Sequence, residues 1–347
     1  MSTADHESRA VARWLLAVAA LVFIMVVLGG VTRLTESGLS MTDWRPVTGW
    51  LPPMSEAAWE AELQKYRASP EYKQINTGMT VAEFKTIFWF EYSHRLLGRL
   101  IGLAFFVPFV IFLVRRKLEK PLALRLWVLF ALGALQGFLG WFMVKSGLVD
   151  RPSVSQYRLA LHLAMALLIY GAIIWTMLGL TRRADYGAGE AAIDPVRRRA
   201  WCLFGLVSVT VVAGAFVAGL DAGLYFNTFP LIDGRLVPQG YFDNEPVWRA
   251  PFEAIAAVQF NHRLIAVVTV VAVIIFWLAH RGRTLSRRSQ NLSATTALMV
   301  LVQAGLGIAT LLAYVPVWLG ALHQAGALVL FTLCLMLVHS LRRADRA

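Results

Sequence analysis

The chain has 347 residues, of which 58% are hydrophobic and 16% charged, and its formal net charge is +12. Together with a mean hydropathy of +0.59, this composition excludes an ordinary soluble globular domain and indicates a polytopic membrane protein. Lys and Arg occur in short clusters between apolar runs, which indicates membrane topology and no nucleic-acid-binding groove. The two cysteines, Cys202 and Cys334, lie inside apolar runs and provide neither a disulfide framework nor a Cys-based metal site.

Eight apolar runs are each long enough to cross a bilayer as a helix. They predict an all-α integral membrane protein with eight transmembrane helices. The runs are residues 12–31, 88–114, 122–144, 159–180, 200–220, 256–279, 294–314 and 317–338.

Basic clusters occur at alternate ends of these runs. By the positive-inside rule these ends are cytoplasmic, which predicts that both termini are cytoplasmic. The first thirteen residues contain Asp5 and Glu7 and no small-residue cleavage pattern, so a bacterial inner membrane is the simplest location. The clusters are Arg9 and Arg13, residues 115–125, Arg182 and Arg183, residues 197–199, residues 281–288, and residues 342–346.

A long outer connection, residues 32–87, contains helix signals of its own. Ser55 precedes a helical pattern over residues 56–66, and Thr80 with Glu83 forms a capping box. The box predicts that the second spanning helix begins above the membrane and continues through residues 91–94. The alternative is a separate loop helix followed by a break.

The two halves of the chain share short motifs. Each half has four spans, an even number, so both halves enter the membrane in the same sense. This predicts a parallel repeat of two four-helix bundles, residues 1–190 and 191–347. The matching motifs are Gly29-Gly30 with Gly214, Glu36-Ser37-Gly38-Leu39 with Asp221-Ala222-Gly223-Leu224, residues 136–140 with 303–307, and Leu161-His162 with Leu322-His323.

Four of the seven histidines lie inside spans, at matching heights. His94, His162, His262 and His323 stand 21, 20, 19 and 19 residues before the first basic residue at the end of their helices. At about 1.5 Å per residue, all four lie roughly 28–31 Å from that end, near the outer boundary of the hydrocarbon. Two imidazoles facing each other in a helix bundle are what bis-histidine haem ligation requires. The other three, His6, His280 and His339, are interpreted as surface residues.

Each pair has a polar neighbour one turn earlier on its first helix. Glu91 precedes His94 by three residues, whereas Gln259 takes the corresponding place before His262. A carboxylate can accept a proton or stabilise positive charge, and an amide does not accept protons under ordinary conditions. The first half is therefore the predicted site of chemistry and the second the predicted electron relay, and Glu91→Gln is expected to retain haem and abolish turnover.

Arginines follow the histidines at both places. Arg95 and Arg99 follow His94, and Arg263 follows His262. Their guanidinium groups suit bidentate pairing with a haem propionate, or else they extend to the outer membrane interface. Arg33 and Lys145, at outer helix ends, have the same two readings.

Several of these stretches resemble the heme A synthase family over nearly the whole chain. The first signature is residues 29–40 followed by Trp44-Arg45-Pro46-Val47-Thr48-Gly49, and the second is Glu91-x-x-His94-Arg95. Residues 140–148, residues 260–263 and Leu322-His323-Gln324 match as well. The chain lacks the outer-loop cysteine pairs of some bacterial members, and so it resembles the proteobacterial and mitochondrial branch.

The resemblance implies oxidation of a ring methyl of heme O to the formyl group of heme A, for cytochrome oxidase assembly. It implies that His262 and His323, with Arg263, hold a heme b cofactor. His94 and His162, with Arg95, would hold the substrate heme O, with Glu91 essential to the chemistry. Delivery of substrate by a heme O synthase, contact with cytochrome oxidase assembly factors and self-association are further expectations of the resemblance.

Two other functions are compatible with parts of the pattern. A di-haem b-type electron-transfer protein would use the same two histidine pairs but would not need an intramembrane carboxylate beside one haem. A transporter built from a parallel repeat would use the polar residues Gln136, Gln303 and Thr210, but its site would lie at the midplane. Conversion of heme O separates an enzyme from both.

Overall fold

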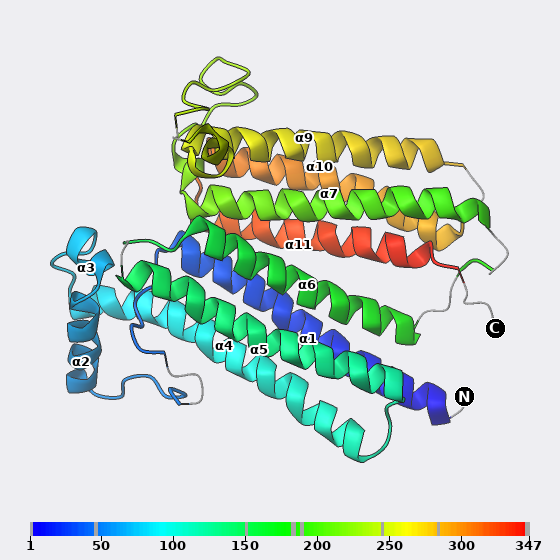
Figure 1. The fold of residues 1–347 in the computed structure, drawn as a ribbon, viewed down its shortest axis with the longest axis horizontal. Helices are drawn as coiled ribbons and strands as arrows, with labels where there is room; N and C mark the ends of the chain where they lie inside the picture. Colours follow the sequence, from blue (N-terminus) through cyan, green and yellow to red (C-terminus); the bar gives the residue numbers. More distant parts are fainter. Residues whose placement is uncertain are drawn as a thin grey trace. The chain divides into compact units, whose positions relative to one another are not determined.

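The computed structural model describes residues 3–44, 48–149, 152–181, 185–187, 191–243, 246–282 and 285–343. Within these ranges the chain is helical, and the two β-bridges, Tyr186 with Arg343 and Ile232 with Arg235, are isolated. The sequence-based expectation of an all-α protein is confirmed. In chain order the helices are α1 (Thr3–Leu34), α2 (Glu56–Arg67), α3 (Pro70–Gln74), α4 (Val81–Val114), α5 (Lys120–Val149), α6 (Gln156–Thr181), η1 (Ala191–Ile193), α7 (Asp194–Gly219), η2 (Ala222–Leu224), η3 (Val247–Arg249), α8 (Ala250–Glu253), α9 (Ile255–His280), α10 (Arg287–Leu312) and α11 (Val317–Ser340) (Figure 1).

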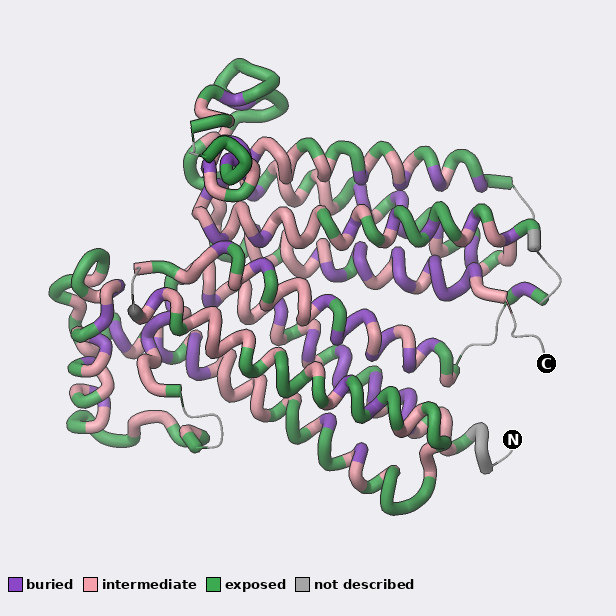
Figure 2. The backbone as a smooth tube through the Cα atoms, in the orientation of Figure 1, coloured by how far each residue is buried: buried purple, intermediate pink, exposed green. Residues whose placement is uncertain are grey.

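Eight of the described helices are long and apolar enough to cross a membrane: α1, α4, α5, α6, α7, α9, α10 and α11. They carry large apolar side chains on their exposed faces, for example Leu103, Val107 and Ile111 of α4. Figure 2 shows such exposed stretches along the long helices. In water these faces would be costly, whereas in hydrocarbon they need no further cover. The chain is a multi-pass membrane protein.

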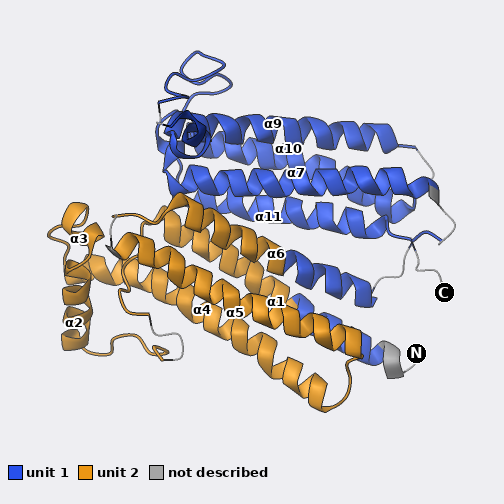
Figure 3. Ribbon diagram, in the orientation of Figure 1, with its two compact units in different colours: residues 1–16, 170–347 blue, residues 17–169 orange. Residues whose placement is uncertain are grey.

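The structure divides into two compact units, coloured separately in Figure 3. Unit 1 comprises residues 1–16 and 170–347, and unit 2 comprises residues 17–169. The boundary falls within α1 and α6. The predicted division at residue 190 and the predicted topology of the termini stay predictions. Of the basic clusters, Arg182, Arg183, Arg283 and Arg346 lie outside the described residues.

Unit 1 contains a closed bundle of four long helices. Helix α7 contacts α9, α9 contacts α10, α10 contacts α11, and α11 contacts α7. Its core is apolar, and Leu328, Leu337 and Val338 of α11 are fully buried. The division that assigns residues 191–347 to a separate bundle of a parallel repeat stays a prediction.

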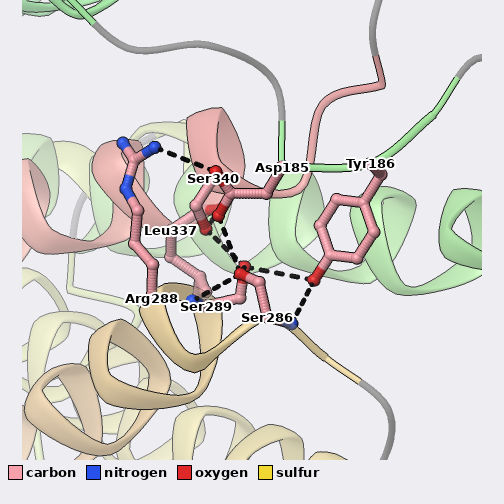
Figure 4. A network of polar contacts seen from close by, with 7 residues as sticks. All are labelled: Asp185, Tyr186, Ser286, Arg288, Ser289, Leu337 and Ser340. Atoms are coloured by element: carbon pink, nitrogen blue, oxygen red, sulfur yellow. Dashed lines mark hydrogen bonds and ion pairs between the residues drawn. The ribbon is translucent and has the colours of Figure 1, made fainter.

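Polar side chains at one end of unit 1 join the connection after α6 to α10 and α11 (Figure 4). Tyr186 donates a hydrogen bond to Ser289, whose hydroxyl is 2.9 Å from that of Ser340. Asp185 accepts a hydrogen bond from Ser286 and pairs with Arg288. These contacts pair hydroxyl groups that burial would otherwise leave unsatisfied.

The prediction that His280 and His339 are surface residues is wrong. His339 is 1% exposed and His280 3% exposed. Trp175 of α6 packs edge-on against the His339 ring at 5.0 Å, and Phe276 packs against His280 at 4.4 Å. Both histidines lie near the end of a span in the sequence, and that position does not reveal that aromatic side chains bury them in the folded protein.

Unit 2 contains α4, α5 and most of α1 and α6, with a smaller outer subdomain built from α2, α3 and the start of α4. The predicted capping box is present: Thr80 accepts from the Glu83 backbone, and Glu83 accepts from the Thr80 backbone. Helix α4 runs from this cap to Val114 without a break, which confirms the prediction of one continuous helix. It starts seven residues before the predicted apolar run because those turns pack on the outer subdomain and not on lipid.

An aromatic core holds the outer subdomain to α4. Phe84, Phe88 and Tyr92 recur every four residues along α4 and therefore share one face. They pack on Trp59 and Tyr66 of α2, with Leu63 completing the buried cluster. The rings of Trp59 and Phe88 meet edge to face at 4.9 Å. The subdomain is therefore anchored to the upper turns of the helix that carries the candidate site.

Glu71, in α3, is a buried carboxyl group in this subdomain. It is 5% exposed and accepts a hydrogen bond of 2.8 Å from the Tyr66 hydroxyl, which itself accepts from Asn76. Burial raises the pKa of Glu71 to about 7, the Tyr66 hydrogen bond opposes the rise, and the charges of Glu91 and Glu36 add to it while Arg33 counters them. The protonated form of Glu71 is therefore favoured in the folded protein.

We expect Glu71→Gln to change how stability depends on pH. The folded carboxyl has its pKa raised from 4.5 to about 7, so its stabilisation is complete below about pH 4.5 and is lost as the pH rises through 7. A shift of this size corresponds to roughly 3 kcal/mol at most. Thermal unfolding between pH 5 and 8 should show the variant gaining stability relative to wild type as the pH rises. Glu56→Gln, at an exposed position of α2, should follow wild type. Parallel curves for wild type and Glu71→Gln would contradict the assignment.

Candidate haem sites and the clasps beside them

In unit 2, His94 of α4 lies against the backbone of α1. A Cβ atom added at Gly29 would be 3.0 Å from His94 Nε2. That is tighter than ordinary side-chain contact, so a glycine is what allows the imidazole to approach the neighbouring helix this closely. The absent side chain of Gly29 leaves room for the His94 ring.

His162 of α6 has the same relation to α5. A Cβ atom at Gly140 would be 3.1 Å from His162 Cε1, and Gln136, one turn away on the same face of α5, donates a 3.1 Å hydrogen bond to the His162 carbonyl. His94 and His162 are near enough to interact electrostatically. Unit 2 therefore brings together the two histidines that the sequence predicted as a pair.

Unit 1 repeats these contacts with its own histidines. A Cβ atom at Gly214 of α7 would be 3.2 Å from His262 Cε1, and one at Gly307 of α10 would be 2.8 Å from His323 Cε1. Gln303, four residues before Gly307, donates a 2.8 Å hydrogen bond to the His323 carbonyl. His262 and His323 also interact electrostatically. The second predicted pair is thus brought together as well.

Glu91, one turn before His94, is 3% exposed and fully engaged. Its Oε2 accepts hydrogen bonds from the Ser40 hydroxyl and the Met41 backbone N–H, both at 2.7 Å, and its Oε1 pairs with Arg95. Arg95 also donates to the carbonyls of Met41 and Asp43, at 2.8 and 2.9 Å. We call this set the Glu91 clasp; it fastens the chain after α1 to α4.

Gln259, 2% exposed, forms the corresponding Gln259 clasp in unit 1. Its Nε2 donates to the Ala222 carbonyl at 2.7 Å, and its Oε1 accepts from Arg263 at 2.8 Å. Arg263 donates in addition to the carbonyls of Phe226 and Thr228. The Glu91 clasp joins the segment after α1 to α4, and the Gln259 clasp joins the segment after α7 to α9. In both, the arginine follows the Glu or Gln by four residues.

The two clasps differ at one atom. The partner of Gln259 Nε2 is an acceptor, a carbonyl oxygen, whereas the partners of Glu91 Oε2 are two donors. Each residue type therefore matches the hydrogen-bonding groups of its own loop. Exchanging the two residues would leave a donor facing a donor or an acceptor facing an acceptor. The Glu/Gln difference seen in the sequence is thus built into the local hydrogen bonding.

Comparisons with known proteins show the family of this chain. A family model described as "Cytochrome oxidase assembly protein" matches residues 12–335. The chain is 50% identical to a heme A synthase of Nitrosospira multiformis over 96% of this chain and 94% of that one. It is 50% identical to the heme A synthase of Parvibaculum lavamentivorans, over 98% and 96%, and 48% identical to the heme A synthase COX15 of Arabidopsis thaliana, over 95% and 74%. The chain belongs to the heme A synthase family.

Sequence reasoning named the four histidines of this heme A synthase family member, but it did not find what supports them. The missed residues are the glycines at 29, 140, 214 and 307, the donors Ser40 and Met41, and the role of Gln136 and Gln303. One signal was available: Gln136/Gly140 and Gln303/Gly307 have the same four-residue spacing. That Arg95 and Arg263 bind haem propionates stays a prediction, since the structure shows both on backbone carbonyls.

The glycine contacts predict that alanine at these positions displaces an imidazole. Gly307→Ala places a Cβ 2.8 Å from His323 Cε1, so the ring must move. We expect this variant to purify with less than half the haem absorbance of wild type. Gly305→Ala, on the same helix α10 with nothing within 4 Å of the added atom, should retain haem. The pair Gly140→Ala and Gly137→Ala gives the same comparison on α5. Equal haem content in both members of a pair would contradict the proposed contacts.

Glu91→Gln is expected to destabilise the protein as well as to affect chemistry. In either amide orientation the new NH₂ group faces donors, Ser40 and Met41 on one side or Arg95 on the other. Leaving such groups unpaired in a buried place costs about 1–3 kcal/mol. Thermal unfolding of the purified variant should therefore begin at a lower temperature. Ser40→Ala, which removes one donor and leaves the ion pair, should have a smaller effect. A wild-type melting temperature for Glu91→Gln would show that the clasp contributes little.

Proposed function

We propose that this protein is a heme A synthase that oxidises a ring methyl of heme O to the formyl group of heme A, for use in cytochrome oxidase. The observation that carries the proposal is the 50% identity to heme A synthases over nearly the whole of both chains. Two pairs of imidazoles inside an eight-span membrane protein are the side chains that haem ligation in a membrane needs.

The residues present fit haem. The Nδ1 atoms of His162 and His262 are buried and have no hydrogen-bond partner among the described residues. The imidazoles lie against glycine backbones, which leaves no neighbouring side chain at those points. His262 and His323 would hold heme b, and His94 and His162 the substrate heme O. When bound, heme b supplies an iron that carries electrons.

The difference between Glu91 and Gln259 supports placing the oxidation in unit 2. Three donors, from Ser40, Met41 and Arg95, hold a negative charge on the Glu91 carboxylate, one helical turn from His94. A fixed negative charge there would stabilise positive charge that develops as the substrate methyl is oxidised. In unit 1 the same place holds a neutral amide, as suits a site that only relays electrons.

The arginines of the clasps would act as positioning residues in this scheme. Arg95 joins Glu91 to two backbone carbonyls of the segment after α1, so it fixes the carboxylate and this segment together. Arg263 does the same for Gln259, and its Nε has no hydrogen-bond partner among the described residues. A propionate of heme b could take up this remaining donor.

The location and partners follow the same proposal. The bacterial inner membrane, with both termini in the cytoplasm, fits the distribution of basic residues in the sequence. The equivalent contacts of His94, His162, His262 and His323 support the parallel repeat of two four-helix bundles, residues 1–190 and 191–347. Transfer of heme O from a heme O synthase, contact with cytochrome oxidase assembly factors and self-association belong to the proposal.

The specific rival is a di-haem electron-transfer protein, because the histidine, glycine and glutamine contacts are the same in both units. An electron carrier would have two equivalent cofactor sites. The enzyme would have one cofactor site and one substrate site.

The two functions predict different haem contents. We expect wild-type protein to contain heme b together with heme O or heme A, identified by acid extraction and chromatography. His262→Ala should lose mainly heme b, and His94→Ala mainly heme O and heme A, because each removes one axial imidazole from one pair. Added heme O should be converted by wild type only. Heme b alone in both sites, with heme O left unconverted, would identify an electron carrier.

A further inference from the structure

One loop of unit 1 carries many large apolar side chains on its surface. This α7–α9 loop comprises residues 225–243 and 246–249, between η2 and α8. Single exposed apolar side chains are normal, but a group of them marks a surface that contacts protein or lipid. Figure 2 shows most of the loop as exposed. The most exposed of its large apolar residues, each between 43% and 80% exposed, are Tyr225, Phe229, Leu236, Val237, Phe242, Val247 and Trp248.

The tip of the α7–α9 loop is an ordered turn. Ile232 and Arg235 exchange two backbone hydrogen bonds, of 2.9 and 3.0 Å. The two residues between them, Asp233 and Gly234, have positive φ, as a two-residue hairpin turn requires. The Thr228 hydroxyl accepts a 2.8 Å hydrogen bond from the Asp233 N–H and so joins the turn to the start of the loop. The exposed apolar side chains are therefore displayed by a folded segment.

Hydrogen bonds also hold the loop at the level where α9 enters the hydrocarbon. Arg263 of α9 donates to the Thr228 carbonyl at 2.7 Å, and Asn261 accepts a 2.9 Å hydrogen bond from the Tyr241 hydroxyl. Arg263 lies 18 residues before Arg281, at the other end of the helix. At helical rise this is about 27 Å, close to the thickness of the hydrocarbon. The base of the loop is therefore fixed at the membrane boundary.

The part of α9 that follows these contacts has an exposed apolar face. Leu264, Val267, Val271 and Ile275 recur every three or four residues and are at least half exposed. Figure 1 shows the loop, in yellow-green, at the start of α9, where it extends sideways beyond this helix. Lipid is necessarily present at this level, because α9 is long and apolar enough to span the membrane. The position of the loop therefore favours lipid as the occupant of its apolar surface.

The residue types of the loop suit the boundary between lipid headgroups and acyl chains. Asp233 and Asp243 are exposed, and charged groups in the hydrocarbon itself are costly. Trp and Tyr are typical of the boundary, where an apolar ring and a polar edge both find partners. Trp248 is 68% exposed, and the Arg249 guanidinium lies over its ring at 5.3 Å. Arginines can place an apolar stem on lipid and a charged end at the phosphates.

We propose that the α7–α9 loop is an interfacial anchor, which lies on the lipid leaflet beside the start of α9. Leu236 and Val237 contact the boundary between headgroups and acyl chains, and Arg235 lies among the phosphates. This inference does not depend on the reaction proposed above. A protein surface is the alternative occupant, and the experiment below distinguishes the two.

Spin labels can measure the depth of the loop on the full-length protein in nanodiscs of phosphatidylethanolamine and phosphatidylglycerol. The background variant Cys202→Ser removes the exposed native thiol, while Cys334 is buried. Single labels are then attached at Leu236→Cys and at Phe242→Cys. Oxygen concentrates in lipid and a nickel chelate in water, so the ratio of the label's accessibility to the two reagents reports its depth. We expect a ratio at both positions severalfold higher than in water.

Two control positions calibrate this ratio. Val267→Cys, on the exposed face of α9, gives the value for hydrocarbon, and Glu56→Cys, at an exposed position of α2 outside the spans, gives the value for water. The loop positions should fall between them. A ratio equal to that of Glu56→Cys at either loop position would place the loop in water and overturn the proposal. An immobilised label with low accessibility to both reagents would show that protein covers the loop, which would overturn it as well.

Discussion

The ion pair between Glu91 and Arg95 is the interaction on which the outer part of unit 2 depends. A carboxylate at this depth in an apolar helix is costly unless its charge is balanced and its lone pairs are used. Arg95, on the same helix α4, balances the charge, and Ser40 and Met41 of the segment after α1 fill the remaining positions. The polar backbone of that segment is satisfied in the same step, because Arg95 donates to two of its carbonyls.

Unit 1 solves the same problem without a charge on the acceptor. Gln259 and Arg263 hold the segment after α7 as Glu91 and Arg95 hold the segment after α1. The clasp is therefore a structural device that both groups of helices need, and the carboxylate is an addition in one of them. This separates two properties that are easily confused at Glu91: its part in fastening a loop, and its negative charge beside His94.

The fold could be predicted from the sequence to the extent that it depends on local patterns. The eight spans follow from apolar length, and the continuity of α4 follows from the Thr80 and Glu83 cap. Spacing to the basic ends predicted one depth for the four histidines, and the repeated motifs assigned one pair, His94 with His162 and His262 with His323, to each half. All of these rest on residues close in sequence or on a common depth in the bilayer.

What the sequence did not reveal depends on which helix lies beside which. Gly29 supports His94 only because α1 packs next to α4, and 65 residues separate the two positions. Ser40 reaches Glu91 across a connection whose path no pattern determines. His339 is buried by Trp175, from a different helix, although its place near the end of a span is typical of an interface residue.

Because α4 is one continuous helix, it connects the outer subdomain rigidly to His94. Fourteen residues separate its cap at Thr80 from His94, a distance of about 21 Å at helical rise. Within that length Phe84, Phe88 and Tyr92 belong to the outer subdomain, so the subdomain and the imidazole are parts of one stiff body. A rotation of the outer subdomain about the axis of α4 would turn His94 by the same angle. The orientation of this ring is therefore set partly by the packing of α4 against the outer subdomain.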